Sequence, residues 1–258
     1  MDLGIHGRKA IVCASSRGLG RACALALAEA GVDVTINGRD EAALAATRND
    51  AEAFGVSVRA VAADVSTPDG QEALLEACPE PDILVNNNGG PPLRNFRELD
   101  RQAMLDGVTM NMVTPIELVQ QVVDGMCDRG FGRIVNITSS SVLSPIPGLD
   151  LSSGARAGLT AFLAGVARSV AGRGVTINQI MPGAFDTDRL RSNIAKGAER
   201  SGKAYEETAA GRRAGIPAGR FGTPKEFGAA CAFLCSARAG YITGQSLLID
   251  GGAFSAAF

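Results

Sequence analysis

The sequence predicts an α/β fold built on one doubly wound parallel sheet of about seven strands. Short runs rich in β-branched residues alternate with longer Ala-rich segments, which is typical of repeated strand–helix–strand units. A glycine-containing stretch, Cys13–Gly20, lies directly between the first such run and the first helical segment. With 258 residues and 46% hydrophobic content, the chain can bury the core of one large domain. A single domain over residues 1–258 is therefore expected.

The individual elements follow from hydrophobic pattern and turn residues. The first helix is expected over Arg21–Ala30 because Gly31 ends its Ala-rich pattern, and a second is expected from about Glu41 to Phe54. The predicted strands are the short apolar runs Lys9–Cys13, Asp33–Asn37, Val58–Ala62, Ile83–Asn86, Arg133–Thr138, Val175–Ile180 and Ser246–Asp250.

Residues 186–220 break this alternation. They are polar, charged and weakly periodic, so we interpret them as an insertion near the carboxyl edge of the sheet. A mobile lid over a site is the functional interpretation, and a plain surface excursion is the structural one.

Charge and composition exclude several classes of partner. The net charge is −2 and the basic residues are scattered, so neither nucleic acid nor an anionic membrane surface is expected as a partner. No apolar run reaches membrane-spanning length and the first residues do not resemble a signal peptide, so a cytoplasmic location is expected. The six cysteines are widely spread, as reduced thiols would be. Cys231 and Cys235 share a helix face, but with His6 as the single histidine they are expected to be core residues rather than metal ligands.

The stretch after the first strand predicts a dinucleotide site in a Rossmann-type fold. Glycines there let the backbone approach a pyrophosphate, and the helix that follows offers free N–H groups at its positive end. The predicted contacts are Ser15, Ser16, Arg17, Gly18, Leu19 and Gly20. The second strand ends in Asn37-Gly38-Arg39 without an acid, so Arg39 and Arg17 favour NADP(H) over NAD(H). The alternative is that both arginines are merely solvated.

The segment Ser139–Arg156 follows a predicted strand and leads into a predicted helix. It resembles the catalytic segment of the short-chain dehydrogenase/reductase family, which places Ser, Tyr and Lys where this chain has Ser139, Ser152 and Arg156. The glycine stretch is similar to the family's T-G-x-x-x-G-x-G, with Ala14 at the first glycine. The resemblance covers about residues 5–252 and is nearest to 3-oxoacyl-acyl-carrier-protein reductases.

The same resemblance assigns further roles in chain order. It implies that Asp64 and Val65 contact adenine, that Asn111 orders a water in a proton relay, and that the long helices following Asn111 and Arg156 make a homotetramer or another homo-oligomer. The remaining implied cofactor contacts are Asn87 and Gly89 of an N-N-A-G-like segment, and Pro182, Gly183 and Thr187 beside the nicotinamide carboxamide.

The missing tyrosine bears directly on the chemistry. In the family its hydroxyl protonates the carbonyl oxygen, whereas a serine hydroxyl is shorter and far less acidic. Arg156 is able to keep a ribose contact and a positive field, but it does not readily release a proton. We expect an NADP(H)-dependent oxidoreductase that interconverts a carbonyl and a secondary alcohol, with Ser139, Ser152, Arg156 and Asn111 in a non-standard relay. The alternatives are a cofactor-binding pseudoenzyme and a non-redox enzyme (dehydratase, isomerase or halohydrin-dehalogenase-like).

Other side chains are candidates for roles in the same pocket. Tyr205 in the lid-like segment and Asp150 near Ser152 are candidate acids, although a surface tyrosine and a solvated turn residue are the favoured interpretations. Arg94, Arg189 and Arg191 are candidates to clamp a carboxylate or phosphate of an anionic small-molecule substrate, with solvated loop charges as the alternative.

Overall fold

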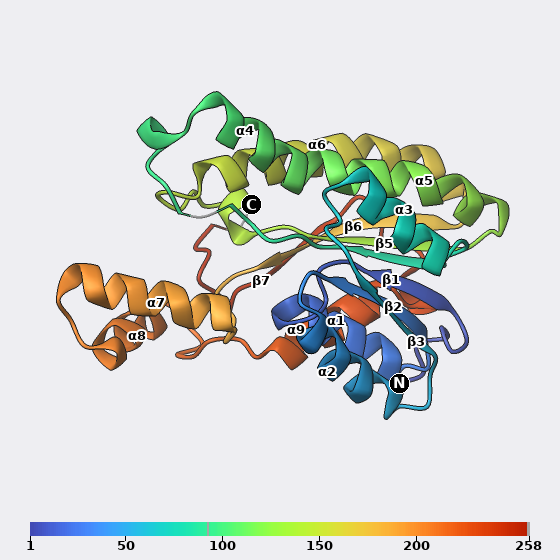
Figure 1. Cartoon of the computed structure of the whole chain (residues 1–258), viewed down its shortest axis with the longest axis horizontal. Coiled ribbons are helices and arrows are strands. Elements are labelled where there is room, and N and C mark those ends of the chain that lie inside the picture. The colour runs from blue at the N-terminus through green and yellow to red at the C-terminus, as the bar shows by residue number, and fades with distance from the viewer. Residues whose placement is uncertain (92, 257–258) are drawn as a thin grey trace.

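A computed structural model describes residues 1–91 and 93–256, and its centre is a seven-stranded parallel sheet (Figure 1). The strand order is β3-β2-β1-β4-β5-β6-β7. The strands are β1 (Lys9–Val12), β2 (Asp33–Gly38), β3 (Val58–Ala62), β4 (Ile83–Asn86), β5 (Gly132–Ile137), β6 (Val175–Pro182) and β7 (Ser246–Ile249). All seven predicted strands are confirmed, with ends that shift by at most two residues.

Helices cover both faces of the sheet. Figure 1 shows α1 (Gly18–Glu29), α2 (Glu41–Glu52) and α9 (Pro224–Leu234) on one face, and α3 (Pro68–Ala77), α4 (Arg101–Val108), α5 (Thr114–Asp128) and α6 (Asp150–Val170) on the other. Two hydrophobic clusters form the core, because neighbouring strand residues face opposite layers: Val12 packs with α1 and α9, whereas Ile11 packs with α5.

The segment 186–220 is more ordered than its sequence suggested. It forms two helices, α7 (Asp188–Ser201) and α8 (Tyr205–Ala214), which lie beyond the end of β6 and apart from the two helix layers (Figure 1). Few of their residues are buried, among them Ile194 and Ala198 in α7. The weak apolar pattern of the sequence therefore reflects helices with a narrow buried stripe. The role of the segment as a lid stays a prediction.

The order of the strands fixes where a ligand site is expected. β1 lies between β2 and β4, so the chain leaves β1 and β4 toward opposite sides of the sheet. In doubly wound folds the crevice at this reversal, at the carboxyl ends of the strands, is where ligands bind. The glycine loop follows β1 and the segment Asn87–Gly90 follows β4, so both border that crevice.

The structure also describes the cysteines and the apolar character of the helices. All six cysteines are free and buried, and Cys231 and Cys235 belong to the core between α9 and the sheet. Within residues 1–91 and 93–256, no helix has the length and apolar character needed to cross a bilayer. The cytoplasmic location remains a prediction.

Candidate active site

A cavity of about 500 Å³ opens at the carboxyl edge of the sheet. Its walls come from the loops after β1, β4, β5 and β6 and from the first turns of α6 and α7. Many of the residues singled out from the sequence line it, among them Arg17, Gly18, Leu19, Asn87, Gly89, Ser139, Ser152, Arg156, Pro182, Gly183, Thr187 and Arg189. The fold therefore brings the glycine loop and the Ser139–Arg156 segment to one space.

The backbone of the glycine loop lies close to its neighbours. A Cβ on Gly20 would fall 2.4 Å from the Ala14 carbonyl oxygen and 2.7 Å from Nδ2 of Asn87, so this position admits only glycine. Gly18 has a φ of +59°, a conformation that L side chains rarely adopt. Ala14 has a φ of 43° and is the one non-glycine residue with positive φ among the described residues. Ala14, at the position of the motif's first glycine, thus has a positive φ, which glycine adopts more readily than alanine.

The first turn of α1 lacks a side-chain cap. Arg17 is the N-cap residue and makes no capping hydrogen bond, and no acidic residue stands in the first turn. By contrast, Asp40 caps α2 and Thr67 caps α3 through their side-chain oxygens. The free N–H groups and the positive end of α1 therefore face the cavity unneutralised, which suits an anionic group.

The two arginines proposed to bind a 2′-phosphate lie on the surface at the end of β2. Arg17 forms an ion pair with Asp40 at 2.5 Å, and Arg39 forms one with Asp64 at 3.5 Å. The Arg39 side chain is 78% exposed. Exposed ion pairs of this kind contribute at most about 1 kcal/mol, so neither pair prevents these guanidiniums from binding another anion.

Some predicted cofactor residues have structural contacts instead of facing the cavity. The Ser15 hydroxyl donates to the Val12 carbonyl and accepts from the Asn37 amide, which joins the loop to β2. Val65 is buried in the core. Ser16, Gly20, Arg39 and Asp64 also lie outside the cavity lining.

Three serine hydroxyls form a connected group at the end of β5. Ser139 Oγ accepts hydrogen bonds from the Ser141 amide at 3.1 Å and the Ser141 hydroxyl at 2.8 Å. Ser153 Oγ lies 2.9 Å from Ser141 Oγ. Because Ser139 Oγ is an acceptor in both of its bonds, its own proton is free to point into the cavity. Ser141 and Ser153 were not singled out from the sequence, although each stands next to or near a predicted serine.

Ser152 and Arg156 form a second, buried pair on α6. Arg156 Nε donates to Ser152 Oγ at 3.2 Å and its Nη1 donates to the Ile137 carbonyl at 2.5 Å. Among the described residues, Arg156 has no carboxylate partner, and Nη2 makes no hydrogen bond. Burial, followed by repulsion from Arg189, lowers the pKa of Arg156 to about 10, so the guanidinium still carries its charge at neutral pH. The site holds an uncompensated buried cation.

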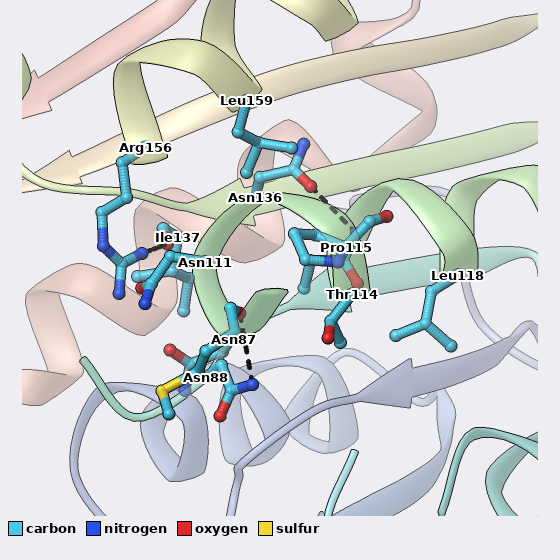
Figure 2. Close-up of a pocket in the computed structure, with 12 residues that line it drawn as sticks. Asn87, Asn88, Asn111, Thr114, Pro115, Leu118, Asn136, Ile137, Arg156 and Leu159 are labelled. Carbon is cyan, nitrogen blue, oxygen red and sulfur yellow. Dashed lines mark hydrogen bonds between the residues drawn. The ribbon is translucent and has the colours of Figure 1, made fainter. Parts of the chain in front are cut away.

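Asn111 borders a separate, smaller cavity beside Arg156. This cavity measures about 20 Å³, which is enough for a single water molecule. Figure 2 shows the Arg156 guanidinium and the Asn111 side chain side by side at its border. Asn111 lies in a π-helical turn, Thr109–Val113, and its Nδ2 donates to the Gly107 carbonyl at 3.3 Å. Its Oδ1 and the Thr114 hydroxyl are buried without a hydrogen-bond partner in the described residues. Such atoms are typical of a water site.

Most of the other candidate acids and substrate-binding arginines do not line the 500 Å³ cavity. The chain has two tyrosines, Tyr205 and Tyr241; both are exposed, and neither lines the 500 Å³ cavity. Asp150 is exposed at the start of α6, and Arg94 does not line the cavity. Arg189 does line the cavity, whereas Arg191 pairs with Asp186 at 2.9 Å on the outside.

The sheet and its glycine loop define a Rossmann-type α/β protein, and sequence comparison gives the family. A family model described as enoyl-(acyl carrier protein) reductase matches residues 13–253. The 3-oxoacyl-acyl-carrier-protein reductase FabG of Vibrio cholerae is 32% identical over 256 residues, which cover 98% of this chain and 99% of the relative. FabG of Aquifex aeolicus is 32% identical over 262 residues, with 98% and 100% covered. The chain belongs to the short-chain dehydrogenase/reductase family of oxidoreductases.

Solved structures agree with this assignment. The L-sorbose reductase of Gluconobacter frateurii, complexed with NADPH and L-sorbose, superimposes with a TM-score of 0.94 at 28% identity, over 99% of this chain and 100% of that one. The actinorhodin polyketide ketoreductase with NADPH gives a TM-score of 0.90 at 28% identity, with 97% and 98% covered. The fold is thus that of reductases solved with NADPH.

Proposed function

We propose that this protein is an NADP(H)-dependent oxidoreductase that interconverts a carbonyl and a secondary alcohol of a small molecule without a tyrosine in its proton relay. The observation that carries the proposal is the single cavity that holds both the glycine loop and the Ser139–Arg156 segment. The solved neighbours that contain NADPH or NADP, and the FabG relatives, support the choice of cofactor and reaction class.

The residues at the cavity fit a dinucleotide. Gly18 and the uncapped first turn of α1 border the cavity and suit a pyrophosphate, and Arg17 and Arg39 suit a 2′-phosphate. Asn87 and Gly89 would lie along the adenosine half, and Pro182, Gly183 and Thr187 beside the nicotinamide. When bound, NADPH supplies the hydride for the carbonyl carbon.

Two groups are placed to stabilise the carbonyl oxygen as negative charge develops on it. The Ser139 hydroxyl is free to donate because Ser141 supplies both of the hydrogen bonds that its oxygen accepts. Arg156 adds a fixed positive charge with an uncommitted Nη2 in a mostly buried site. Oriented donors in a site of low dielectric constant are typically the largest catalytic contribution.

The proton is proposed to reach the oxygen through Ser152 and a water. Arg156 Nε donates to Ser152 Oγ, so the serine proton is free to point toward the substrate, and the adjacent cation makes its release easier. The 20 Å³ cavity has room for one water, which would hydrogen bond to Asn111 Oδ1 beside the Arg156 guanidinium. Ser139, Ser152, Arg156 and Asn111 thereby share the task of the family's tyrosine and lysine.

Steady-state assays with a panel of aldehydes and ketones test this function. We expect NADPH oxidation with part of the panel and tighter binding of NADPH than of NADH. Ser139→Ala should lower kcat by about 100-fold, the typical effect of removing one oxyanion donor, with NADPH affinity retained. Ser201→Ala, at the end of α7, is the control and should leave kcat unchanged. NADPH binding without turnover on any substrate would instead establish a cofactor-binding pseudoenzyme.

A further inference from the structure

A second hollow, which we name the basic groove, continues from the cavity along α7. It measures about 600 Å³ and lies between α7 and the loop after β4, with Gly90, Pro91 and Leu93 on the loop side. Arg189 and Asn193 line both the cavity and the basic groove, so the two spaces share a border. A molecule whose reacting group lies at Ser139 can therefore extend into the groove.

One face of α7 gives the groove its charge. Arg189, Asn193, Lys196 and Arg200 follow one another at intervals of three or four residues, which places them on the same side of the helix. Glu199 is the one acidic residue among the described residues that line the groove. Three cations against one carboxylate leave the groove with a net positive charge.

The ion pairs of this region distinguish the groove from the outer surface. Arg191 pairs with Asp186 at 2.9 Å, and Lys203 pairs with Glu207 at 2.7 Å. Across the part of the chain that the structure describes, Arg189, Lys196 and Arg200 take part in no ion pair. Asp188 of α7 and Glu206 and Glu207 of α8 thus pair with cations outside the groove. Glu199 is in no ion pair among the described residues, so the groove cations keep their capacity to bind an anion.

We propose that the substrate is an extended carbonyl compound with an anionic end, a carboxylate or a phosphate, which binds Arg189, Lys196 and Arg200 in the basic groove. The inference rests on the proposed function for the position of the reacting carbonyl. It goes beyond that function by assigning a substrate class and a second binding region. The reaction itself is unchanged, because Lys196 and Arg200 line the groove but not the cavity, so the anionic end serves to orient the carbonyl.

Calorimetric binding to the protein saturated with NADP⁺ tests the proposal without requiring turnover. The probes are methyl ketones with a terminal carboxylate and increasing chain length, each compared with its methyl ester. We expect the carboxylate of the best-fitting length to bind at least tenfold more tightly than its ester, and this preference to shrink as salt is added. The double variant Lys196→Gln/Arg200→Gln should lose most of the preference.

The matched control is Arg191→Gln/Lys203→Gln, which removes the same charge from paired cations of the same segment and should keep the preference. Equal affinity for acid and ester at every length, or an equal loss in both double variants, would overturn the proposal. A fall in NADP⁺ affinity in Lys196→Gln/Arg200→Gln would also overturn it, since these cations would then bind the cofactor. Absence of hydride transfer with an intact acid preference would contradict the proposed reaction alone.

Discussion

At the scale of single residues, the site keeps the positions of the family's catalytic segment but changes their chemistry. The sequence identified Ser139, Ser152 and Arg156, and the structure places all three at one cavity. The contact of Ser139 with Ser141 was not predictable, because it depends on the short 3-10 turn that follows β5. The small cavity at Asn111 was likewise hidden, since it arises from the packing of α5 and α6 against β4 and β5.

The Gly20 position provides a test of the dinucleotide loop. Gly20→Ala places a Cβ 2.4 Å from the backbone oxygen of Ala14, which, unlike the end of a flexible side chain, does not move aside easily. We expect unfolding stability to fall by about 1–3 kcal/mol, as in other overpacked sites, and NADPH affinity to fall at least tenfold. Gly211→Ala is the control, because nothing lies within 4 Å of its Cβ and α8 should be slightly stabilised. Unchanged NADPH affinity in Gly20→Ala would argue against the loop as the cofactor site.

At the scale of elements, the strands were predictable and the segment after β6 was not. Parallel strands covered on both faces have continuous apolar runs, such as Ile83–Asn86, which a sequence displays directly. α7 and α8 bury few side chains, so their apolar signal is weak although Thr187 caps α7. α1 begins at Gly18 rather than Arg21 because the glycine loop itself enters the helix. Helix ends of this kind depend on backbone conformation more than on apolar pattern.

The start of α9 predicts how stability depends on pH. Thr223 and Glu226 form a capping box, and hydrogen bonds from Arg220 and then Thr223 lower the pKa of Glu226 from 4.5 to about 2. A depressed carboxyl pKa adds stability above pH 4.5, and this stability is lost as the pH falls through about 2. Glu226→Gln should therefore flatten the loss of stability between these values, measured by urea unfolding. Glu76→Gln, which removes an exposed acid without an ion pair in the described residues, should leave the slope unchanged.

At the scale of the whole molecule, we propose a homo-oligomer, as the resemblance of α5 and α6 to the helices of family interfaces implied. The outer side of this layer exposes several large apolar side chains, with Met104 and Leu105 on α4 and Phe162 on α6 between 45% and 49% exposed. Apolar residues gathered on one layer are typical of a protein–protein interface. The composition of the sequence alone did not indicate which apolar side chains are exposed on this layer, because their exposure depends on how the helices pack.

Sedimentation velocity tests the oligomer. The wild-type protein should sediment as a dimer or tetramer, and Phe162→Glu should shift it toward the monomer because a charge would be buried at the interface. Phe54→Glu is the control, since Phe54 is 46% exposed next to α2 in the opposite layer. A monomeric wild-type protein, or an unchanged assembly in Phe162→Glu, would contradict the expected interface.

The central claim is that a carbonyl is reduced here without a phenol. Since the chain has two tyrosines, the double variant Tyr205→Phe/Tyr241→Phe contains none. The decisive measurement is kcat for NADPH-dependent reduction by this variant beside the wild-type protein. We expect equal kcat values, because the double variant leaves Ser139, Ser152 and Arg156 unchanged. A fall of 100-fold or more with NADPH binding retained would show that a tyrosine supplies the proton and would contradict reduction without a phenol.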